Sequence, residues 1–325
     1  MAFVENKKQI TVETEGKKRL DIYLKEITGL SRGKAQKLID YKNVLVNSSD
    51  SVSYHTKVKN GDIIQYSEKI PESYSVAAAD IPVDVIYEDE YILGINKQPG
   101  LVVHPAPGHL NDTLVNALAK RFNKKEAYFS DESRLGIVHR LDRDTSGVMI
   151  VAKNEQAYIK LGQIFRRREI KKIYSCLVHG AIEEKGDINI NIGRDAADRR
   201  RFAAGVEGGK NARTIFKPEE NFYNTALLKV RIMTGRTHQI RVHMKFIKHE
   251  VIGDPRYGNK NKDFQILEYL GFDRKSYRDI MPRQMLHAEE IEFLHPFTGD
   301  TLIIKAPVPP DFSRLTALLG KKKEA

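Results

Sequence analysis

Residues 139–147 have the sequence His-Arg-Leu-Asp-Arg-Asp-Thr-Ser-Gly and lie between two apolar runs, residues 135–138 and 148–152. Short apolar runs favour buried strands, so the polar stretch is predicted to be a turn on a rigid scaffold, where functional sites are common. Asp, Thr, Ser and Gly are frequent in ordinary turns, which accounts for residues 144–147. An ordinary turn does not account for His-Arg-Leu-Asp directly after a buried strand, and we therefore expect a functional site here.

Asp142 offers the clearest chemistry in this stretch. It lies between Arg140 and Arg143 in the sequence, and nearby guanidinium charge keeps a carboxylate ionised. An ionised Asp can act as a nucleophile or as a general base. The stretch alone leaves both roles open.

The order His-Arg-Leu-Asp-x-x-Thr-Ser-Gly, followed by an apolar strand, resembles the signature of the RluA/RluD-type pseudouridine synthases. The resemblance implies that Asp142 is the catalytic residue and that Asp144 occupies a variable position. Residues 96–105, Asn-Lys-Gln-Pro-Gly-Leu-Val-Val-His-Pro, are similar to the first motif of that family. They depart from it at Gln98, because the family usually has Pro directly after the Lys.

Two further segments carry the same resemblance. Residues 172–174, Lys-Ile-Tyr, are similar to the family's Lys-x-Tyr, which implies that the ring of Tyr174 stacks on the target uracil. Residues 234–243, Thr-Gly-Arg-Thr-His-Gln-Ile-Arg-Val-His, resemble the third motif, which implies that Arg241 pairs with the catalytic Asp. A buried carboxylate needs such a partner to stay ionised.

We therefore predict one catalytic group and one substrate-binding group. The predicted catalytic residues are Asp142, Tyr174 and Arg241. The predicted substrate-binding residues are Arg140, His139, Thr145, Arg236, His238 and Gln239. By resemblance, Arg140 fills the space that a flipped nucleotide leaves. His238 and His243 are spaced unlike a metal-binding pair on one helix face, so no metal site is predicted.

The composition is that of a soluble globular protein with one large domain or two, because its 325 residues are 41% hydrophobic and 30% charged. A net charge of +11 indicates a polyanionic partner, most simply nucleic acid, although excess charge also serves solubility. The single cysteine, Cys176, fits a reducing compartment. No signal peptide or membrane-spanning run is evident, so a cytoplasmic location is predicted.

The first part of the chain is basic and helical. Residues 17–27 and 32–40 have helical apolar spacing, with Ser31 as the expected N-cap of the second helix, and residues 44–47 and 63–66 favour strands. Basic residues gather here and predict contact with RNA phosphates, although a solvated helix face accounts for them equally well. Residues 17–66 resemble the S4 RNA-binding domain, apart from Lys42 where a Gly is usual. The predicted RNA-binding residues are Arg19, Arg32, Lys34 and Lys37.

The predicted fold class is α+β, with an S4-like RNA-binding domain over residues 1–69, a linker over 70–82 and a catalytic domain over 83–325. The catalytic domain is expected to contain a mixed, largely antiparallel sheet of pseudouridine synthase type. Helices are predicted from Asp112 to Phe122, from the N-cap Asn154 to about Arg168, and after the N-cap Thr237. Residues 193–213, rich in Gly, Ala and Arg, are predicted to form a mobile basic loop.

The resemblance implies that the protein isomerises specific uridines in RNA to pseudouridine, with large-subunit ribosomal RNA as the expected substrate. The glycosidic bond breaks, the uracil turns and it reattaches through C5, so the target must leave its stack. Since no redox or phosphate chemistry is involved, neither a cofactor nor a metal is expected. RNA is the expected partner, and the expected state is a monomer without an obligatory protein partner.

Two alternatives stay open at this point. Residues 142–145 also fit the Asp-x-Asp-x-Thr of magnesium-dependent phosphotransferases, but that fold needs further acidic residues and alternating strands and helices. A non-catalytic ribosome-binding protein could use the S4-like domain and basic surface alone. It predicts that Asp142→Asn leaves every activity unchanged.

Overall fold

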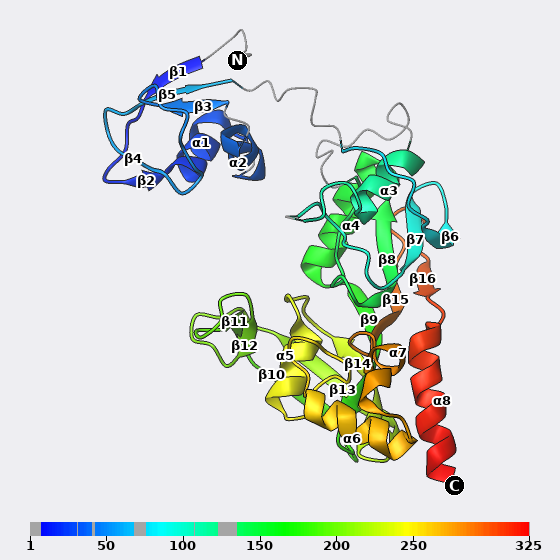
Figure 1. Cartoon of the computed structure of the whole chain (residues 1–325). Helices are drawn as coiled ribbons and strands as arrows, with labels where there is room; N and C mark the ends of the chain where they lie inside the picture. Colours follow the sequence, from blue (N-terminus) through cyan, green and yellow to red (C-terminus); the bar gives the residue numbers. More distant parts are fainter. Residues whose placement is uncertain are drawn as a thin grey trace. The chain divides into compact units, whose positions relative to one another are not determined.

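A computed structural model gives the fold of the protein (Figure 1). The structure describes residues 8–30, 32–40, 43–67, 76–106, 108–122 and 135–324. The chain divides into two compact units, residues 1–75 and residues 76–325, and each is described by itself.

The first unit combines two helices with short strands around one apolar core. Its helices are α1 (Leu20–Thr28) and α2 (Arg32–Asp40). Its strands are β1 (Lys8–Thr11), β2 (Lys18–Arg19), β3 (Val44–Val46), β4 (Lys57–Val58) and β5 (Ile63–Tyr66). The main sheet has the order β1-β5-β3, and β2 pairs with β4. Both predicted helices are present, whereas Ser31 and Lys42 lie outside the described residues.

Asp21 is a fully buried carboxylate of α1 that gathers three polar side chains. Arg19 donates to it through two nitrogens at 3.0 Å, Arg32 through Nε at 2.9 Å, and Gln36 through its amide at 2.7 Å. Burial alone would raise the pKa of Asp21, but these hydrogen bonds lower it well below its usual range. Two predicted RNA-binding arginines therefore converge on one carboxylate. The side chains of Lys34 and Lys37 lie outside the described part of the structure.

Asp21→Asn is expected to destabilise the first unit by about 2–3 kcal/mol, because hydrogen bonds to a buried charge are lost. Hydrogen exchange of the α1 amides in the full chain would measure this. The control is Glu26→Gln on the same helix, which breaks only an exposed pair with Lys18 and should cost less than about 1 kcal/mol. Because the folded-state pKa of Asp21 is lowered, its contribution is present above pH 4 and fades as the pH falls through the folded pKa. Equal effects of the two variants would contradict this prediction.

The second unit is built on one nine-stranded sheet. Its strands in spatial order are β10 (Gly186–Asn189), β13 (Arg213–Phe222), β14 (Thr225–Ile232), β9 (Ile170–His179), β15 (Leu286–Leu294), β8 (Ser146–Ala152), β7 (Ile92–Lys97) and β6 (Asp84–Glu88), with β16 (Thr301–Lys305) paired to β15. Every pair is antiparallel except β8 with β15. This confirms the prediction of a largely antiparallel sheet.

The parallel junction between β8 and β15 is short and close. Ser146 lies opposite His287, and Gly147 lies opposite Ala288. Gly147 has φ +116°, and a Cβ there would lie 2.1 Å from the carbonyl oxygen of Ala288. Only Gly has a backbone that can both adopt this conformation and approach so closely. The Gly that ends the polar stretch therefore fixes residues 139–147 at the junction between the two halves of the sheet.

The helices of the second unit connect and cover these strands. They are α3 (Leu114–Arg121), α4 (Glu155–Arg167), α5 (Gln239–Phe246), α6 (Lys260–Leu270), the 3-10 turn η2 (Arg274–Ser276), α7 (Tyr277–Ile280) and α8 (Pro310–Glu324). Helix α4 packs against β8 and α5 packs against β13 (Figure 1). Within the described residues, no helix combines the length and the apolar character needed to cross a membrane.

The N-cap residues of α3, α4 and α5 can be compared with the predicted ones. Asn154 caps α4 as predicted, since its side chain accepts from the backbone N–H of Ala157 at 2.9 Å. Asp112, predicted to cap the helix that runs to Phe122, is not the N-cap; the N-cap is Thr113, whose backbone N–H donates to the side chain of Asn116 at 3.1 Å. The predicted N-cap Thr237 is also wrong. The N-cap of α5 is the next residue, in a left-handed conformation that sequence patterns rarely indicate.

Two segments differ from their predicted loop or linker character. Residues 76–82 lie within the second unit, where the side chain of Asn116 donates to the carbonyl of Ala77 at 2.8 Å and Val76 packs on the core. Residues 68–75 lie outside the described residues. Residues 193–213 contain parts of a hairpin, β11 (Ile192–Arg194) and β12 (Phe202–Ala204), instead of an irregular loop. Strands this short are too brief to show the alternating pattern on which strand prediction depends.

Candidate active site

A pocket of about 470 Å³ lies where the polar stretch, the end of α4, strand β9 and the start of α5 meet. This volume is within the range of small-ligand sites. All nine residues predicted for catalysis and substrate binding line it, namely His139, Arg140, Asp142, Thr145, Tyr174, Arg236, His238, Gln239 and Arg241. The pocket therefore joins segments that are far apart in the sequence.

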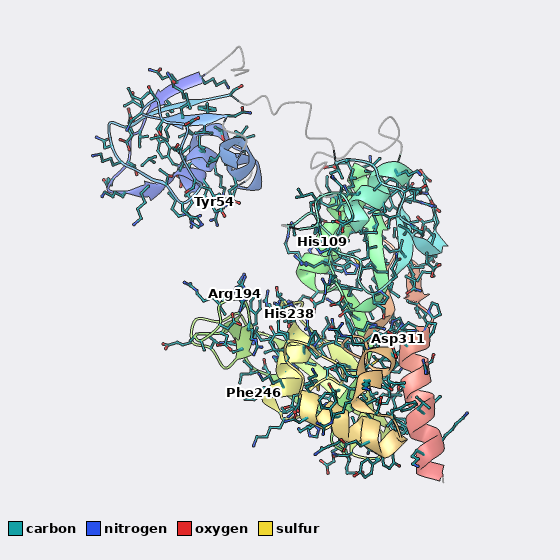
Figure 2. All side chains as sticks on the ribbon, viewed as in Figure 1. Tyr54, His109, Arg194, His238, Phe246 and Asp311 are labelled. Carbon is teal, nitrogen blue, oxygen red and sulfur yellow. The ribbon has the colours of Figure 1, made fainter. Side chains whose placement is uncertain are left out.

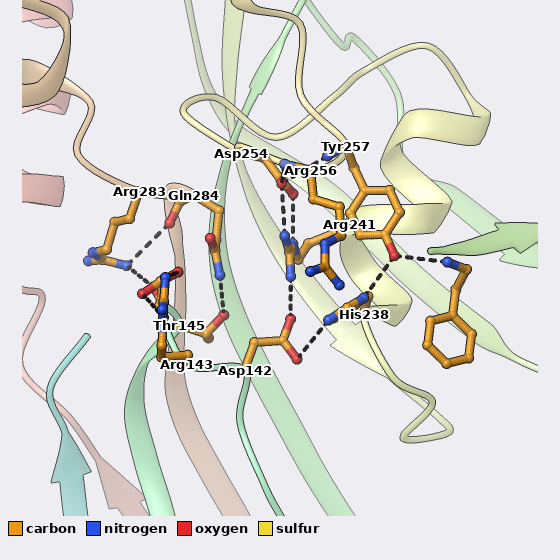
Figure 3. Close-up of polar contacts among 12 residues, drawn as sticks. Asp142, Arg143, Thr145, His238, Arg241, Asp254, Arg256, Tyr257, Arg283 and Gln284 are labelled. Carbon is orange, nitrogen blue, oxygen red and sulfur yellow. Dashed lines mark hydrogen bonds and ion pairs between the residues drawn. The ribbon is translucent and has the colours of Figure 1, made fainter. Parts of the chain in front are cut away.

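Asp142 and Arg241 form an ion pair in the pocket wall (Figure 3). Arg241 donates through Nη1 to Oδ2 of Asp142 at 2.8 Å, and the two side chains are 6% and 21% exposed. Within the described residues, the other carboxylate oxygen, Oδ1, accepts no hydrogen bond, and Nε2 of His238 lies 3.8 Å from it. Asp142 thus offers one held and one open oxygen to the pocket.

A second carboxylate holds Arg241 from behind. Asp254 is fully buried and accepts from Nε and Nη2 of Arg241 at 2.6 and 2.8 Å (Figure 3). It also accepts from the backbone N–H groups of Arg256 and Tyr257 at 2.8 and 3.0 Å. Burial alone would raise the pKa of Asp254, but Arg241 and these N–H groups lower it. Burial alone would lower the pKa of Arg241, but its two carboxylate partners raise it.

The turn that carries Asp254 depends on the glycine before it. Gly253 has φ +71°, and a Cβ there would lie 2.2 Å from the carbonyl oxygen of Arg283. Asp254 is not among the predicted site residues. The only available signal was Gly-Asp-Pro, which marks a turn but does not identify the side chain's partner.

His238 and Tyr257 complete a ring of contacts around the ion pair. Nδ1 of His238 lies 2.8 Å from the hydroxyl of Tyr257, which accepts from the backbone N–H of Phe202 at 3.0 Å. Burial lowers the pKa of His238 to about 4, against the opposing pull of Asp142, so its ring is neutral at pH 7. Figure 2 labels His238 and, on the hairpin that includes Phe202, Arg194. The hairpin thus contacts the site through Tyr257 and through the ring of Phe202, whose centroid lies 5.8 Å from that of His238 in an edge-on arrangement.

Tyr174 lies on β9 and is 8% exposed. Burial, followed by the charge of Asp142, raises the pKa of its hydroxyl. The side chain is therefore a neutral phenol at neutral pH. Its side chain lines the pocket.

Three of the predicted substrate-binding residues make internal contacts. Nε2 of His139 accepts from the backbone N–H of Ile150 at 2.9 Å, its ring stacks on Phe165, and burial lowers its pKa to about 3. The side chain of Thr145 lies 3.3 Å from the amide nitrogen of Gln284, which donates to it. The side chain of Gln239 accepts from the Thr234 hydroxyl at 2.7 Å and from the Arg236 backbone N–H at 3.0 Å.

The two remaining predicted substrate-binding residues, both arginines, differ in exposure and in hydrogen bonding. Arg140 is exposed, whereas Nε of Arg236 donates to the carbonyl of Asn211 at 2.9 Å. Lys97, which is not among the predicted site residues, binds the backbone of the polar stretch. Its buried Nζ donates to the carbonyls of Gln98, Leu101 and Arg143 at 2.8, 3.1 and 2.8 Å, and burial lowers its pKa to about 7.

No cluster of three or more His, Cys, Asp or Glu side chains that could hold a metal ion occurs among the described residues. Arg143 pairs with Asp144 at 3.0 Å, and Asp142 pairs with Arg241. The two aspartates of the Asp-x-Asp-x-Thr pattern are therefore each bound to an arginine. The sheet around them is also not the alternating strand-helix arrangement that the phosphotransferase alternative requires.

The chain is similar in sequence to known proteins. Residues 91–246 match the RNA pseudouridylate synthase family. The chain is 37% identical over 319 residues to the RNA pseudouridine synthase YlyB of Bacillus subtilis, which covers 97% of this chain and 99% of that one. It is 41% identical over 248 residues to ribosomal large subunit pseudouridine synthase D of Pseudomonas aeruginosa, which covers 76% and 75% of the two chains.

A solved structure shares the fold. The human RNA pseudouridylate synthase domain containing 1 matches with a TM-score of 0.56 and 27% identity, over 73% of this chain and 87% of that one. Fold, pocket and similarity together define an RNA-modifying isomerase, and the chain belongs to the RNA pseudouridine synthase family. Within the family it is of the RluA/RluD type. The phosphotransferase and non-catalytic alternatives are therefore wrong.

Proposed function

We propose that this enzyme converts specific uridines of large-subunit ribosomal RNA to pseudouridine, with Asp142 acting on the ribose of a flipped nucleotide. The observation that carries the proposal is the Asp142–Arg241 pair, which leaves Oδ1 of Asp142 open to the pocket. Relatives named ribosomal large subunit pseudouridine synthase D support the RNA substrate.

The reaction is an isomerisation in which every atom is retained apart from an exchanged proton. The N1–C1′ bond of uridine breaks, the uracil turns, C5 bonds to C1′, the C5 proton leaves and N1 gains a proton. Asp142 acts either by attacking C1′ or by removing the C2′ proton to form a glycal. Both routes need an open carboxylate oxygen beside the ribose, and Arg241 holds the carboxylate in the charged form.

The other residues position the substrate. The ring of Tyr174 stacks on the uracil, and its phenol is placed to take part in proton transfer at C5. Arg140, which is exposed at the pocket, fills the space left in the RNA by the flipped nucleotide. Removing the target from its stack costs a few kcal/mol, which such contacts offset.

The first unit adds RNA affinity in this proposal. It contains the residues predicted to form an S4-like domain, and its basic residues Arg19 and Arg32 both bind Asp21. Both arginine side chains keep part of their surface exposed, at 31% and 51%. A pair of fixed, exposed cations is suited to phosphate groups of folded RNA.

Mapping pseudouridines in ribosomal RNA tests the proposed function. Cells that lack this protein are expected to lose one or a few large-subunit pseudouridines, and the wild-type protein but not Asp142→Asn should restore them. Restoration by both proteins would exclude Asp142 from catalysis. An unchanged map in the deletion strain would exclude ribosomal RNA as the substrate.

A further inference from the structure

Among the residues that line the pocket, positive charge exceeds what the single carboxylate, Asp142, balances. Six cationic side chains line the pocket, namely Arg140, Arg166, Arg168, Lys172, Arg236 and Arg241. Arg241 pairs with two carboxylates and Arg236 binds a backbone carbonyl. In the described part of the chain, the other four form no ion pair. Cations that gather without carboxylates around a pocket indicate an anionic ligand.

Lys172 is the most unusual of the four. It is half-buried on β9, whereas the next residue back, Lys171, pairs with Glu292 at 2.5 Å. Its Nζ lies 5.9 Å from the ring centre of Phe165. Gly235, which also lines the pocket, lies close to the same Nζ. A helix end that favours cations accounts for Arg166 and Arg168 at the end of α4, but not for a lysine in the middle of a sheet.

The position of Lys172 relative to Tyr174 suggests what the anion is. The two residues are two apart on one strand, so their side chains share a face of the sheet about 7 Å apart. Tyr174 is the proposed stacking platform for the base. With the base stacked on Tyr174, the side chain of Lys172, two residues away on the same strand, is within reach of the sugar-phosphate backbone of that nucleotide.

We propose that Lys172 and Arg168 bind the RNA phosphate that adjoins the target uridine. The assignment rests on the proposed function, because it takes the base in this pocket to be the substrate uracil. This contact binds the RNA backbone next to the flipped nucleotide and is separate from the contacts to the base itself. Phosphate contacts of this kind fix the register of the RNA without reading its sequence.

The backbone of Arg168 supports a role for its side chain. Arg168 ends α4 with φ +62°, in the left-handed region where Gly is favoured. The backbone conformation therefore favours Gly at this position, whereas the helix end favours a cation, and an arginine is present. Arg168→Gly is therefore expected to keep or raise the thermal unfolding midpoint while it weakens RNA binding, two changes in opposite directions.

The charge state of Lys172 provides a second signature. Burial, followed by the charge of Arg168, lowers its pKa to about 8, so the amine loses its charge as the pH rises through that value. The charged or titratable groups around it are Arg168 from α4 and His139 from the polar stretch, which stays neutral. RNA affinity should therefore fall by up to about tenfold from pH 7 to pH 9, following the charged fraction. Lys172→Arg should remove this dependence, while the buried Lys97 titrates equally in both proteins.

The experiment measures binding of the full-length enzyme to a large-subunit ribosomal RNA fragment that contains a uridine modified by wild type. Lys172→Met is compared with Lys171→Met, which removes the same charge one residue away. Lys172→Met should weaken binding about tenfold and reduce the slope of log affinity against log salt by about 0.7–0.9, the value for one phosphate contact. Lys171→Met should match wild type in both measurements.

Each outcome decides the proposal. If Lys172→Met and Lys171→Met behave alike, no phosphate is bound by Lys172. If Lys172→Met weakens binding but keeps the wild-type salt slope, its contact is to the base and the proposal is also wrong. A wild-type enzyme that modifies no uridine of any ribosomal fragment would instead overturn the proposed function, which separates the two failures.

Discussion

Asp142→Asn is expected to bind RNA about as tightly as wild type and to form pseudouridine at least about 10³-fold more slowly. An amide can neither attack C1′ nor accept the C2′ proton, but it keeps the size of the carboxylate and can still accept from Arg241. Single-turnover release of tritium from RNA labelled at C5 of uridine would measure the loss, because that proton leaves in the reaction.

Asp144→Asn is the matched control for Asp142→Asn. It makes the same change of charge two residues away, where the carboxylate pairs with the exposed Arg143. We expect it to retain activity within a few-fold of wild type, since a partly exposed pair contributes about 1 kcal/mol or less. Equal losses in the two variants would mean that the charge of the loop matters and that Asp142 has no special role.

Arg241→Met is expected to abolish activity and to lower the free energy of unfolding by about 3–5 kcal/mol. The substitution keeps an unbranched side chain but leaves Asp254 fully buried without its ionic partner. Urea unfolding followed by a probe in the second unit would measure the effect. Arg241→Lys should also lose most activity, because one ammonium group lacks the fork that engages two carboxylates at once.

A double variant separates the two consequences of losing Arg241. Adding Asp254→Asn removes the unpaired buried charge, so the double variant should regain about 1–3 kcal/mol over Arg241→Met but no activity. In wild type the lowered pKa of Asp254 contributes stability at neutral pH that is lost as the pH falls through its folded value. Without Arg241 the carboxylate is destabilising when charged, so mild acid should narrow the gap to wild type. Additive effects of the two substitutions would rule out the buried pair.

The sequence predicted those parts of the fold and site whose signals are local. The helix over residues 32–40 and the cap at Asn154 depend on nearby residues, and both are present. Nine residues of one pocket were predicted because they lie in three continuous motif segments, residues 139–147, 172–174 and 234–243. Which cap is used at α3 could not be predicted, since Asp112 and Thr113 are both good candidates and only packing decides between them.

Contacts between distant segments could not be predicted from local patterns, and the Asp142–Arg241 pair was predicted only through the family resemblance. The carboxylate of Asp254 faces Arg241 because Gly253 brings its backbone against Arg283, which lies beyond another helix in the chain. Lys97 and Lys172 each belong to a segment that resembles a family motif, but only the fold reveals that Lys97 is buried and Lys172 is half-buried. Apolar periodicity reports which face of an element is buried, but it does not report which polar side chain lies opposite.

The place of β15 in the sheet determines when the active site can form. This strand lies between β8 and β9, yet it follows both in the chain. The ribosome releases residues 286–294 only after Asp142, Tyr174 and Arg241 have emerged, and until then the strand that pairs with both β8 and β9 is missing. A nascent chain therefore contains nearly every residue of the pocket before the strand that completes it, and the pocket can form only after residues 286–294 have emerged.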